Sequence, residues 1–507
     1  HRIQQQQQQQ EKEKEEEEEE EADGEGEDTP GRPRKALKAG PFLQWGTRRI
    51  VLAESNIGVR GSGEEEETRL PAGSLLAAHS RRCMCNGHGP EHGASEELGQ
   101  LLEANPLEHV SRQRLAAALR GTAFLHRGVK AYHCKWDTYA GDVMLLLAGV
   151  SLRSTGQSKE DAEKRFWRLA SMYEARYQNW SSCGAAATDP EGNSGDVLCL
   201  AEGLLALRWM GVDIHSRAGL QSVWDGVRQA LAEQCEVVEL FGFDPREGVL
   251  PMTKRSNCNH CTSPNDESAS RCRYCGWVLR AMPQYEDLTD AMVWCHILEE
   301  LGITLTSGRG AGAGTVGMHH VLSIYPQIYP YLPKEHIGTD LYKQQCYCIT
   351  HLILAMSKYG RLALSGEQFR AEYKFLHQNM RVVVEMRDPE LVGEFVDCLA
   401  ILGAADRDVE MLRGRTFLLH LERERGGRGR WTDTDATFYR HYHSSWCGVV
   451  GLMQHAFQGV GPMYAAEWAA VAEASKYWAG NYAQVLAKEK VEGMPAWNLE
   501  TDPAHPE

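Results

Sequence analysis

Six apolar segments, each about four helical turns long, constrain the fold of this chain more than any other feature. Nearly all of them meet a glycine near their end, where glycine suits the left-handed conformation that closes a helix. Amphipathic segments such as Ser158 to Trp180, Gly219 to Gln234 and Ser365 to Met386 lie between them. Apolar helices are buried on more of their surface than amphipathic ones, so the alternation predicts an inner and an outer set of helices. The apolar segments run from His133 to Gly149, Asp196 to Gly211, Asp287 to Gly302, Cys346 to Gly360, Pro389 to Gly403 and Phe438 to Gly451.

Two start signals sharpen this pattern. Asp388, Pro389 and Glu390 follow the order of an N-cap, a first-turn proline and an early acid. Ser365 with Gln368 fits a capping box, which predicts that a helix begins there.

The spacing of the closing glycines indicates a repeat with one insertion. The successive intervals are 62, 91, 58, 43 and 48 residues, and the longest contains a cluster of cysteines. Removing residues 250–282 leaves that interval at 58 residues, in line with its neighbours. We therefore predict an all-α fold of helical-hairpin repeats, arranged as a closed α/α toroid, with a small zinc ribbon inserted. An open helical solenoid is the alternative arrangement.

The helix pairs between about residues 120 and 485 resemble the α/α toroid of prenyltransferases, terpene cyclases and related enzymes. Trp431 and the stretch from Tyr442 to Cys447 are similar to the repeats of those proteins. The stretch from Asp433 to Ala436 lacks the further aspartate of the cyclase acid motif. The resemblance therefore implies a fold but no particular catalytic chemistry.

Charge and composition divide the chain into parts. The formal net charge is -16, but residues 1–28 alone carry -10 and Glu64 to Glu67 add -4, so the remainder is close to neutral. That balance argues against a surface that binds nucleic acid nonspecifically. We expect a disordered low-complexity tail and linker over residues 1–95, a helical body over 96–249 and 283–485, the zinc-ribbon insert over 250–282, and a C-terminal tail over 486–507.

The strongest motif is Cys258-x2-Cys261-x10-Cys272-x2-Cys275. Two C-x2-C turns place four thiolates around one tetrahedral position, as in zinc ribbons, which this motif resembles. Four thiolates leave no open coordination position, so we predict a structural Zn²⁺ that stabilises the insert.

Basic and aromatic residues surround these cysteines, including Arg273 and Trp277. Such a patch suits phosphate contact and base stacking, and it equally suits an acidic protein surface. A nucleic-acid adaptor would show salt-sensitive RNA or DNA binding that is lost on Arg273→Ala and Trp277→Ala.

Two other segments contain residues that could form a site. Cys83, Cys85, His88 and His92 place four possible ligands within ten residues, which suggests a second metal site or an incidental cluster. The glycine-rich stretch from Ser307 to Gly314 lacks the lysine of a phosphate-binding loop, so we expect a flexible connector.

Polar groups also occur inside the apolar segments. Glu390, Glu394 and Asp397 are spaced to share one helical face. If these segments surround a cavity, carboxylates and imidazoles could meet in it, for acid–base chemistry or to hold a hard cation. The candidate catalytic residues are His351, Glu394, Asp397 and His443.

These observations leave three functions open. The leading interpretation is a zinc-binding helical-repeat scaffold with protein partners, and the nucleic-acid adaptor is a second. The third is a toroid enzyme, which is favoured if His351, Glu394 and His443 lie within about 6 Å of one another around a deep pocket, and which fails if the inner helices pack shut or the array is open. Cys447 follows His443 by four residues, the spacing of a Cys/His pair, but no third orienting group is identifiable.

Cysteine usage and hydropathy bear on location. Fifteen cysteines in 507 residues are too dilute for a disulfide scaffold, which favours an intracellular, reducing compartment such as cytoplasm or nucleus. No apolar stretch reaches the roughly 18 to 20 residues that a membrane span needs. The chain begins with His1 rather than methionine, so organelle targeting stays open.

Overall fold

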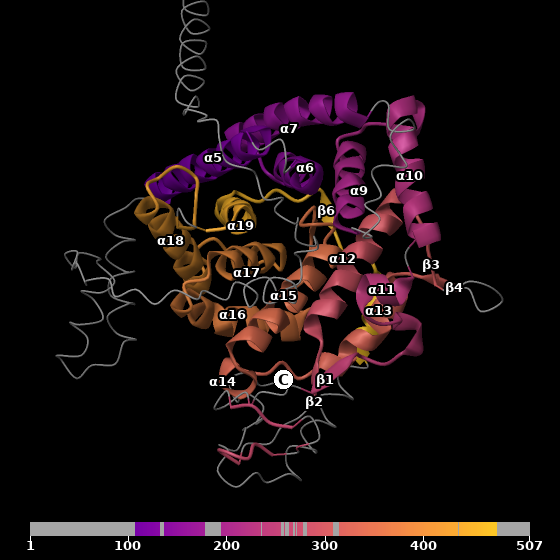
Figure 1. Cartoon of the computed structure of the whole chain (residues 1–507). Helices are drawn as coiled ribbons and strands as arrows, with labels where there is room; N and C mark the ends of the chain where they lie inside the picture. The colour runs from indigo at the N-terminus through magenta and orange to yellow at the C-terminus, as the bar shows by residue number, and fades with distance from the viewer. Residues whose placement is uncertain are drawn as a thin grey trace, which may run out of the picture. The chain divides into compact units, whose positions relative to one another are not determined.

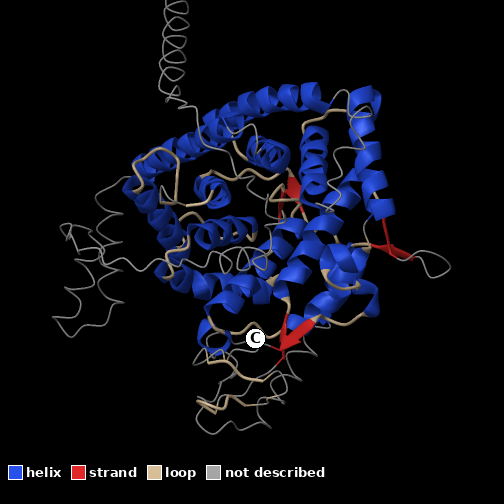
Figure 2. Cartoon of the chain, viewed as in Figure 1, coloured by secondary structure: helices blue, strands red, loops and turns tan. Residues whose placement is uncertain are grey.

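Helices dominate the structure, and its strands are all short (Figures 1 and 2). This computed structural model describes residues 107–131, 136–177, 194–234, 236–254, 258, 263–266, 269, 271–276, 281–307, 314–433 and 436–473. The prediction of a mostly α-helical protein is confirmed over these residues. The predicted terminal tails and the cluster of Cys83, Cys85, His88 and His92 lie outside them.

Each of the six apolar segments forms a helix, as predicted. Their side chains make up much of the buried core, in which Trp294 and Phe395 are fully buried. The six helices are α6 (Trp136–Arg153), α9 (Ser194–Trp209), α12 (Tyr285–Leu301), α15 (Thr339–Met356), α17 (Pro389–Ile401) and α19 (Phe438–Leu452).

The amphipathic segments are helical as well. They form α7 (Gly156–Tyr177), α10 (Ala218–Gln234) and α16 (Arg370–Glu385), and two further long helices are α5 (Leu107–Ala131) and α18 (Val409–Glu424). Shorter elements join them: α11 (Val237–Phe241), α13 (Met318–Ile324), α14 (Lys334–Ile337), and the 3-10 turns η2 (Ile214–Ser216), η3 (Pro245–Glu247) and η4 (Tyr325–Ile328).

Four of the six closing glycines have the predicted left-handed backbone. Gly211, Gly302, Gly360 and Gly403 all have positive φ angles, between 71° and 89°. The prediction is wrong at the other two positions, because α6 runs on to Arg153 past Gly149 and α19 includes Gly451. Gly451 serves close packing instead, since a Cβ there would lie 3.1 Å from the Cα of Gly393 on α17. We have no physical account of Gly149, around which a Cβ would meet nothing within 4 Å.

The start signal at α17 is confirmed and the one at α16 is wrong. The Asp388 side chain caps α17 by accepting hydrogen bonds from the backbone nitrogens of Glu390 and Leu391. Helix α16 begins only at Arg370, because residues 366–369 form a turn in which the Ser365 hydroxyl accepts from the backbone of Glu367.

The six apolar helices pack side by side in chain order. Helix α6 contacts α9, α9 contacts α12, α12 contacts α15, α15 contacts α17, and α17 contacts α19. Tyr139 of α6 also reaches the last helix of the series, with its ring 5.1 Å from that of Phe438 and 5.0 Å from that of Tyr442. The amphipathic helices cover them: α7 packs on α6, α10 on α9, and α16 and α18 on α17 (Figure 1).

The short strands among the described residues form three pairs. Strand β1 (Met252–Lys254) pairs antiparallel with β2 (Ala281–Pro283), so the two ends of the cysteine-containing segment lie together. Strands β3 (Leu305–Ser307) and β4 (Gly314–Val316) pair across the glycine-rich stretch, whose residues 308–313 are outside the described part. Strands β5 (Leu362–Ala363) and β6 (Gly459–Val460) form a parallel pair.

No helix among the described residues is long and apolar enough to cross a membrane.

Candidate functional site

Four ionisable side chains meet where α17 packs against α19, and we call them the interior cluster: Glu390, Glu394, His443 and Cys447. The two helices approach closely because α17 has a glycine at the crossing. A Cβ on Gly393 would lie only 2.2 Å from the backbone oxygen of Cys447. The absence of that atom lets the carboxylates of α17 reach the side chains of α19.

Within the interior cluster, Glu390 holds His443. One carboxylate oxygen lies 3.0 Å from Nδ1 of His443 and also accepts a 3.1 Å hydrogen bond from the Tyr347 hydroxyl of α15. The other oxygen accepts a 2.7 Å hydrogen bond from the Ser444 hydroxyl. The two hydroxyls thus fix the carboxylate, which in turn orients the imidazole.

The electrostatics of this pair are those of a buried ion pair. Burial by itself would raise the pKa of Glu390, but the charge of His443 and the hydrogen bonds outweigh it and lower that pKa. Burial would likewise lower the pKa of His443, but the charge of Glu390 and its hydrogen bond raise it. Both directions favour a charged carboxylate beside an imidazolium.

Glu394, one helical turn further along α17, has different surroundings. It accepts a 2.5 Å hydrogen bond from the Thr350 hydroxyl, and its other oxygen lies 3.8 Å from the sulfur of Cys447. Burial raises the pKa of Glu394 to about 7, and Glu390 adds to the rise, whereas His443 and Thr350 oppose it. Burial also raises the pKa of the Cys447 thiol, with a further contribution from Glu394.

The interior cluster opens on a cavity of about 30 Å³. Glu394, His443, Cys447, Arg153 and Asp397 are among the residues that line it. This volume is enough for at least one water molecule but not for a large ligand, so the cavity is not the deep pocket that the toroid-enzyme interpretation expects.

The second pair at the cavity is a buried salt bridge between distant parts of the chain. Nη2 of Arg153, the last residue of α6, lies 2.8 Å from Asp397, which is also 2.6 Å from Nε2 of His455. Burial alone would raise the pKa of Asp397, but Arg153 and His455 lower it. Nη1 of Arg153 is buried and has no hydrogen-bond partner among the described residues.

Of the four candidates expected from the sequence, three line the cavity: Glu394, Asp397 and His443. His351 lies behind Glu394, 4.0 Å from its carboxylate, with Nδ1 2.8 Å from the backbone oxygen of Tyr347. Burial lowers the pKa of His351 to about 4, which favours a neutral ring.

Sequence reasoning missed Arg153 and His455 as members of this site. Each lies at or beyond the end of a helix, and Arg153 is far along the chain from Asp397. No spacing pattern in the sequence connects either residue with Asp397. The only signal in the sequence is an arginine at the end of an apolar helix, which would need a partner if it were buried.

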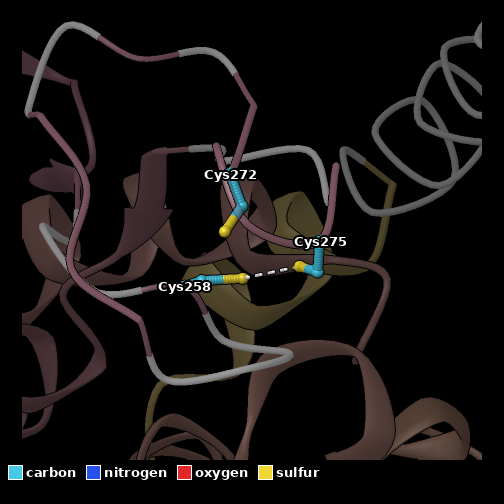
Figure 3. A group of neighbouring side chains, drawn as sticks. All are labelled: Cys258, Cys272 and Cys275. Atoms are coloured by element: carbon cyan, nitrogen blue, oxygen red, sulfur yellow. Dashed lines mark hydrogen bonds between the residues drawn. The ribbon is translucent and has the colours of Figure 1, made fainter.

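The second group of possible ligands is formed by three of the motif cysteines. The sulfurs of Cys258, Cys272 and Cys275 all lie within 4.8 Å of one another, and Figure 3 shows the side chains pointing toward each other. Cys261, the fourth member of the motif, lies outside the described residues. None of the described cysteines forms a disulfide.

The positions of Cys258, Cys272 and Cys275 are compatible with a zinc-binding knuckle, and we call these three residues the knuckle. The sulfurs of Cys258 and Cys275 are 3.6 Å apart, close to the roughly 3.8 Å expected between two thiolates on one tetrahedral zinc with Zn–S near 2.3 Å. The sulfur of Cys272 accepts from the backbone nitrogen of Tyr274 at 3.4 Å and from Nδ2 of Asn265 at 3.5 Å. Such donors stabilise a thiolate.

No family model, no curated protein and no solved structure matches the chain.

Proposed function

We propose that this chain is an enzyme that acts on a small substrate at the cavity lined by Glu394, His443 and Cys447. The observation that supports it is the convergence of so many buried ionisable groups on one small space. Burying charged groups is unfavourable, and apolar side chains of similar volume would stabilise the fold equally well or better. Buried ionisable groups that stabilise the fold no better than apolar side chains would are candidates for function.

The roles follow from the contacts. Glu390 positions His443, as an acidic residue commonly orients a catalytic imidazole. Glu394 and Cys447 face the same cavity as His443. Asp397 holds Arg153 at the same cavity, and Nη1 of Arg153 could donate to an oxygen of the substrate.

We also propose that the helical body is a closed α/α toroid rather than an open solenoid. Its support is the chain of contacts from α6 through α19, together with the Tyr139 ring that connects the first of these helices to the last. In an open solenoid the first and last repeats would not touch.

For the knuckle we propose a structural Zn²⁺ held by Cys258, Cys261, Cys272 and Cys275. The sulfur positions of three of them support it. The pairing of β1 with β2 supports the further proposal that residues 250–282 are an insertion between two helices of the body.

A binding function through the knuckle is the second candidate. Tyr274 is 60% exposed, and the guanidinium of Arg273 lies 4.8 Å from its ring centre, so a cationic and aromatic surface faces solvent. The small volume of the interior cavity also favours a binding module, because a cavity of that size admits no large substrate. Salt-sensitive RNA binding, and its loss on Arg273→Ala, is the test of this candidate.

The enzyme proposal predicts that Glu394 contributes little to folding. Among the described residues Glu394 has no lysine or arginine partner, so Glu394→Gln removes a charge without leaving a cation unpaired. The matched control is Glu422→Gln, because Glu422 is fully buried and bonds Arg120 at 2.8 and 3.0 Å and the backbone of Gly429 at 2.9 Å.

Urea unfolding in the presence of a chelator measures both variants. We expect Glu422→Gln to lose about 1–3 kcal/mol of unfolding free energy. Glu394→Gln should lose less than about 0.5 kcal/mol, or gain stability. Equal losses in the two variants would mean that Glu394 serves the fold, and the enzyme proposal would be abandoned.

A further inference from the structure

We infer a second metal site in this chain, separate from the knuckle, in which Glu394, His443 and Cys447 bind one divalent transition-metal ion. Its use in catalysis rests on the proposed function, whereas its occupancy does not.

The first argument is the donor set. A carboxylate oxygen, an imidazole nitrogen and a cysteine sulfur lie within 4.8 Å of one another, and all three side chains are buried. Carboxylate, imidazole and thiolate are the three ligand types that proteins use for zinc. The thiolate argues against Mg²⁺ or Ca²⁺, which prefer oxygen ligands.

The second argument is the partner of the imidazole. Histidines that bind metals usually give their other ring nitrogen to a carboxylate, which fixes the ring and the tautomer. Glu390 occupies this position, 3.0 Å from Nδ1 of His443, so Nε2 would be the nitrogen that binds the ion, which would displace the proton that Nε2 carries in the imidazolium. Glu390 is itself held by the hydroxyls of Tyr347 and Ser444.

The third argument is charge and space. With Glu394 as a carboxylate and Cys447 as a thiolate, two negative charges balance the two positive charges of the ion. This balance makes it less unfavourable to bury the carboxylate, the thiolate and the ion together. Three protein ligands leave a fourth tetrahedral position open. The cavity of about 30 Å³ that all three residues line has room for a water molecule in that position.

The local sequence explains how the ligands meet. His443 and Cys447 are four residues apart on α19 and therefore share one helical face. Glu394 joins them from α17 because its neighbour Gly393 allows the two backbones to approach. The 3.8 Å separation of the Cys447 sulfur from Glu394 is already near that of two ligands on one ion.

Metal analysis of the purified full-length chain tests the inference, with single cysteine substitutions that separate the possible sites. Cys447→Ser is expected to lose one equivalent of zinc relative to the unaltered chain. Cys272→Ser addresses the knuckle, and Cys83→Ser addresses the N-terminal cluster. Cys398→Ser is the matched control, because Cys398 is a buried cysteine of α17 whose sulfur contacts the backbone oxygen of Thr350. Equal zinc content in Cys447→Ser and Cys398→Ser would overturn the inference.

A spectroscopic measurement covers the case in which Cys447→Ser does not fold. In the full chain with Cys258→Ser and Cys272→Ser, added Co²⁺ should give a thiolate-to-cobalt absorption band and the visible bands of a tetrahedral ion. Glu390→Gln in the same background should weaken Co²⁺ binding about 10- to 100-fold. Absence of the thiolate band would refute the site.

The two proposals fail separately. If the ion binds but Glu394→Gln destabilises the fold as much as Glu422→Gln, the metal site stands and the enzyme proposal falls. If no ion binds and Glu394→Gln is neutral, the metal site falls and a metal-free reaction centre stands.

Discussion

Glu390 and Glu394 lie one turn apart on the same helix and have opposite surroundings. Glu390 faces an imidazolium and two hydroxyls, whereas Glu394 faces one hydroxyl and a thiol. Their spacing, together with that of Asp397, predicts a shared face from the sequence alone. The difference between the surroundings of Glu390 and Glu394 was not predictable, because the groups that decide each pKa come from α15 and α19. The partner of Asp397 was not predictable either, because Arg153 comes from α6.

Glu300 gives a prediction that depends on pH and lies away from the interior cluster. Its carboxylate is 3.0 Å from Arg361 and 3.2 Å from Lys358. Burial would raise the pKa of Glu300, but His296, Lys358 and Arg361 outweigh it and lower that pKa. A lowered folded-state pKa means that the carboxylate stabilises the fold above its unfolded pKa, near 4.3, and loses this contribution as the pH falls through the folded value.

We therefore expect Glu300→Gln to lower the unfolding free energy by about 1–3 kcal/mol at pH 7 and by less near pH 4. Urea unfolding at the two pH values measures the difference. Glu385→Gln is the control, since the exposed pair of Glu385 with Arg381 should contribute little at either pH. A loss at Glu300 that does not change with pH would contradict the assigned ion pairs.

Helix α17 shows how one element determines the geometry of the site. Apolar periodicity and the Asp388 cap predict its existence and its start, and both are confirmed. The sequence does not predict which helix crosses it at Gly393, because glycine at a helix end and glycine at a helix crossing look alike. The same ambiguity produced the wrong prediction at Gly451, which belongs to the α17–α19 contact.

Gly393→Ala tests the crossing. The added methyl group would overlap the backbone of Cys447, so we expect a loss of about 1–3 kcal/mol in unfolding free energy. Gly149→Ala is the matched control, because it lies inside α6 with no atom within 4 Å of an added Cβ, and it should stabilise by about 0.5–1 kcal/mol. Thermal unfolding of the two variants gives the comparison. If Gly393→Ala unfolds at the same temperature as Gly149→Ala, α17 and α19 are not in close contact at Gly393.

Across the whole molecule, the sequence predicted the number and order of the apolar helices better than their arrangement. Alternation of apolar and amphipathic segments is a local property and was read correctly at all six positions. Contact between α6 and α19 is not local, and it depends on the summed crossing angles of every helix between them. The proposed toroid and the proposed interior centre therefore depend on the same packing, since α15, α17 and α19 must all converge to form the cavity.

We assign different roles to the knuckle and the interior cluster. Four thiolates would close the coordination of the knuckle zinc, so that ion would stabilise the insert without reacting. The three ligands of the interior cluster would leave one position open beside the cavity. We therefore place the proposed function in the helical body.

Anomalous diffraction from crystals of the full chain, measured on both sides of the zinc absorption edge, tests this assignment most directly. We expect two zinc peaks per chain, one among Cys258, Cys272 and Cys275 and one among Glu394, His443 and Cys447. A single peak at the knuckle, with none at the interior cluster of a chain purified without chelator, would contradict it.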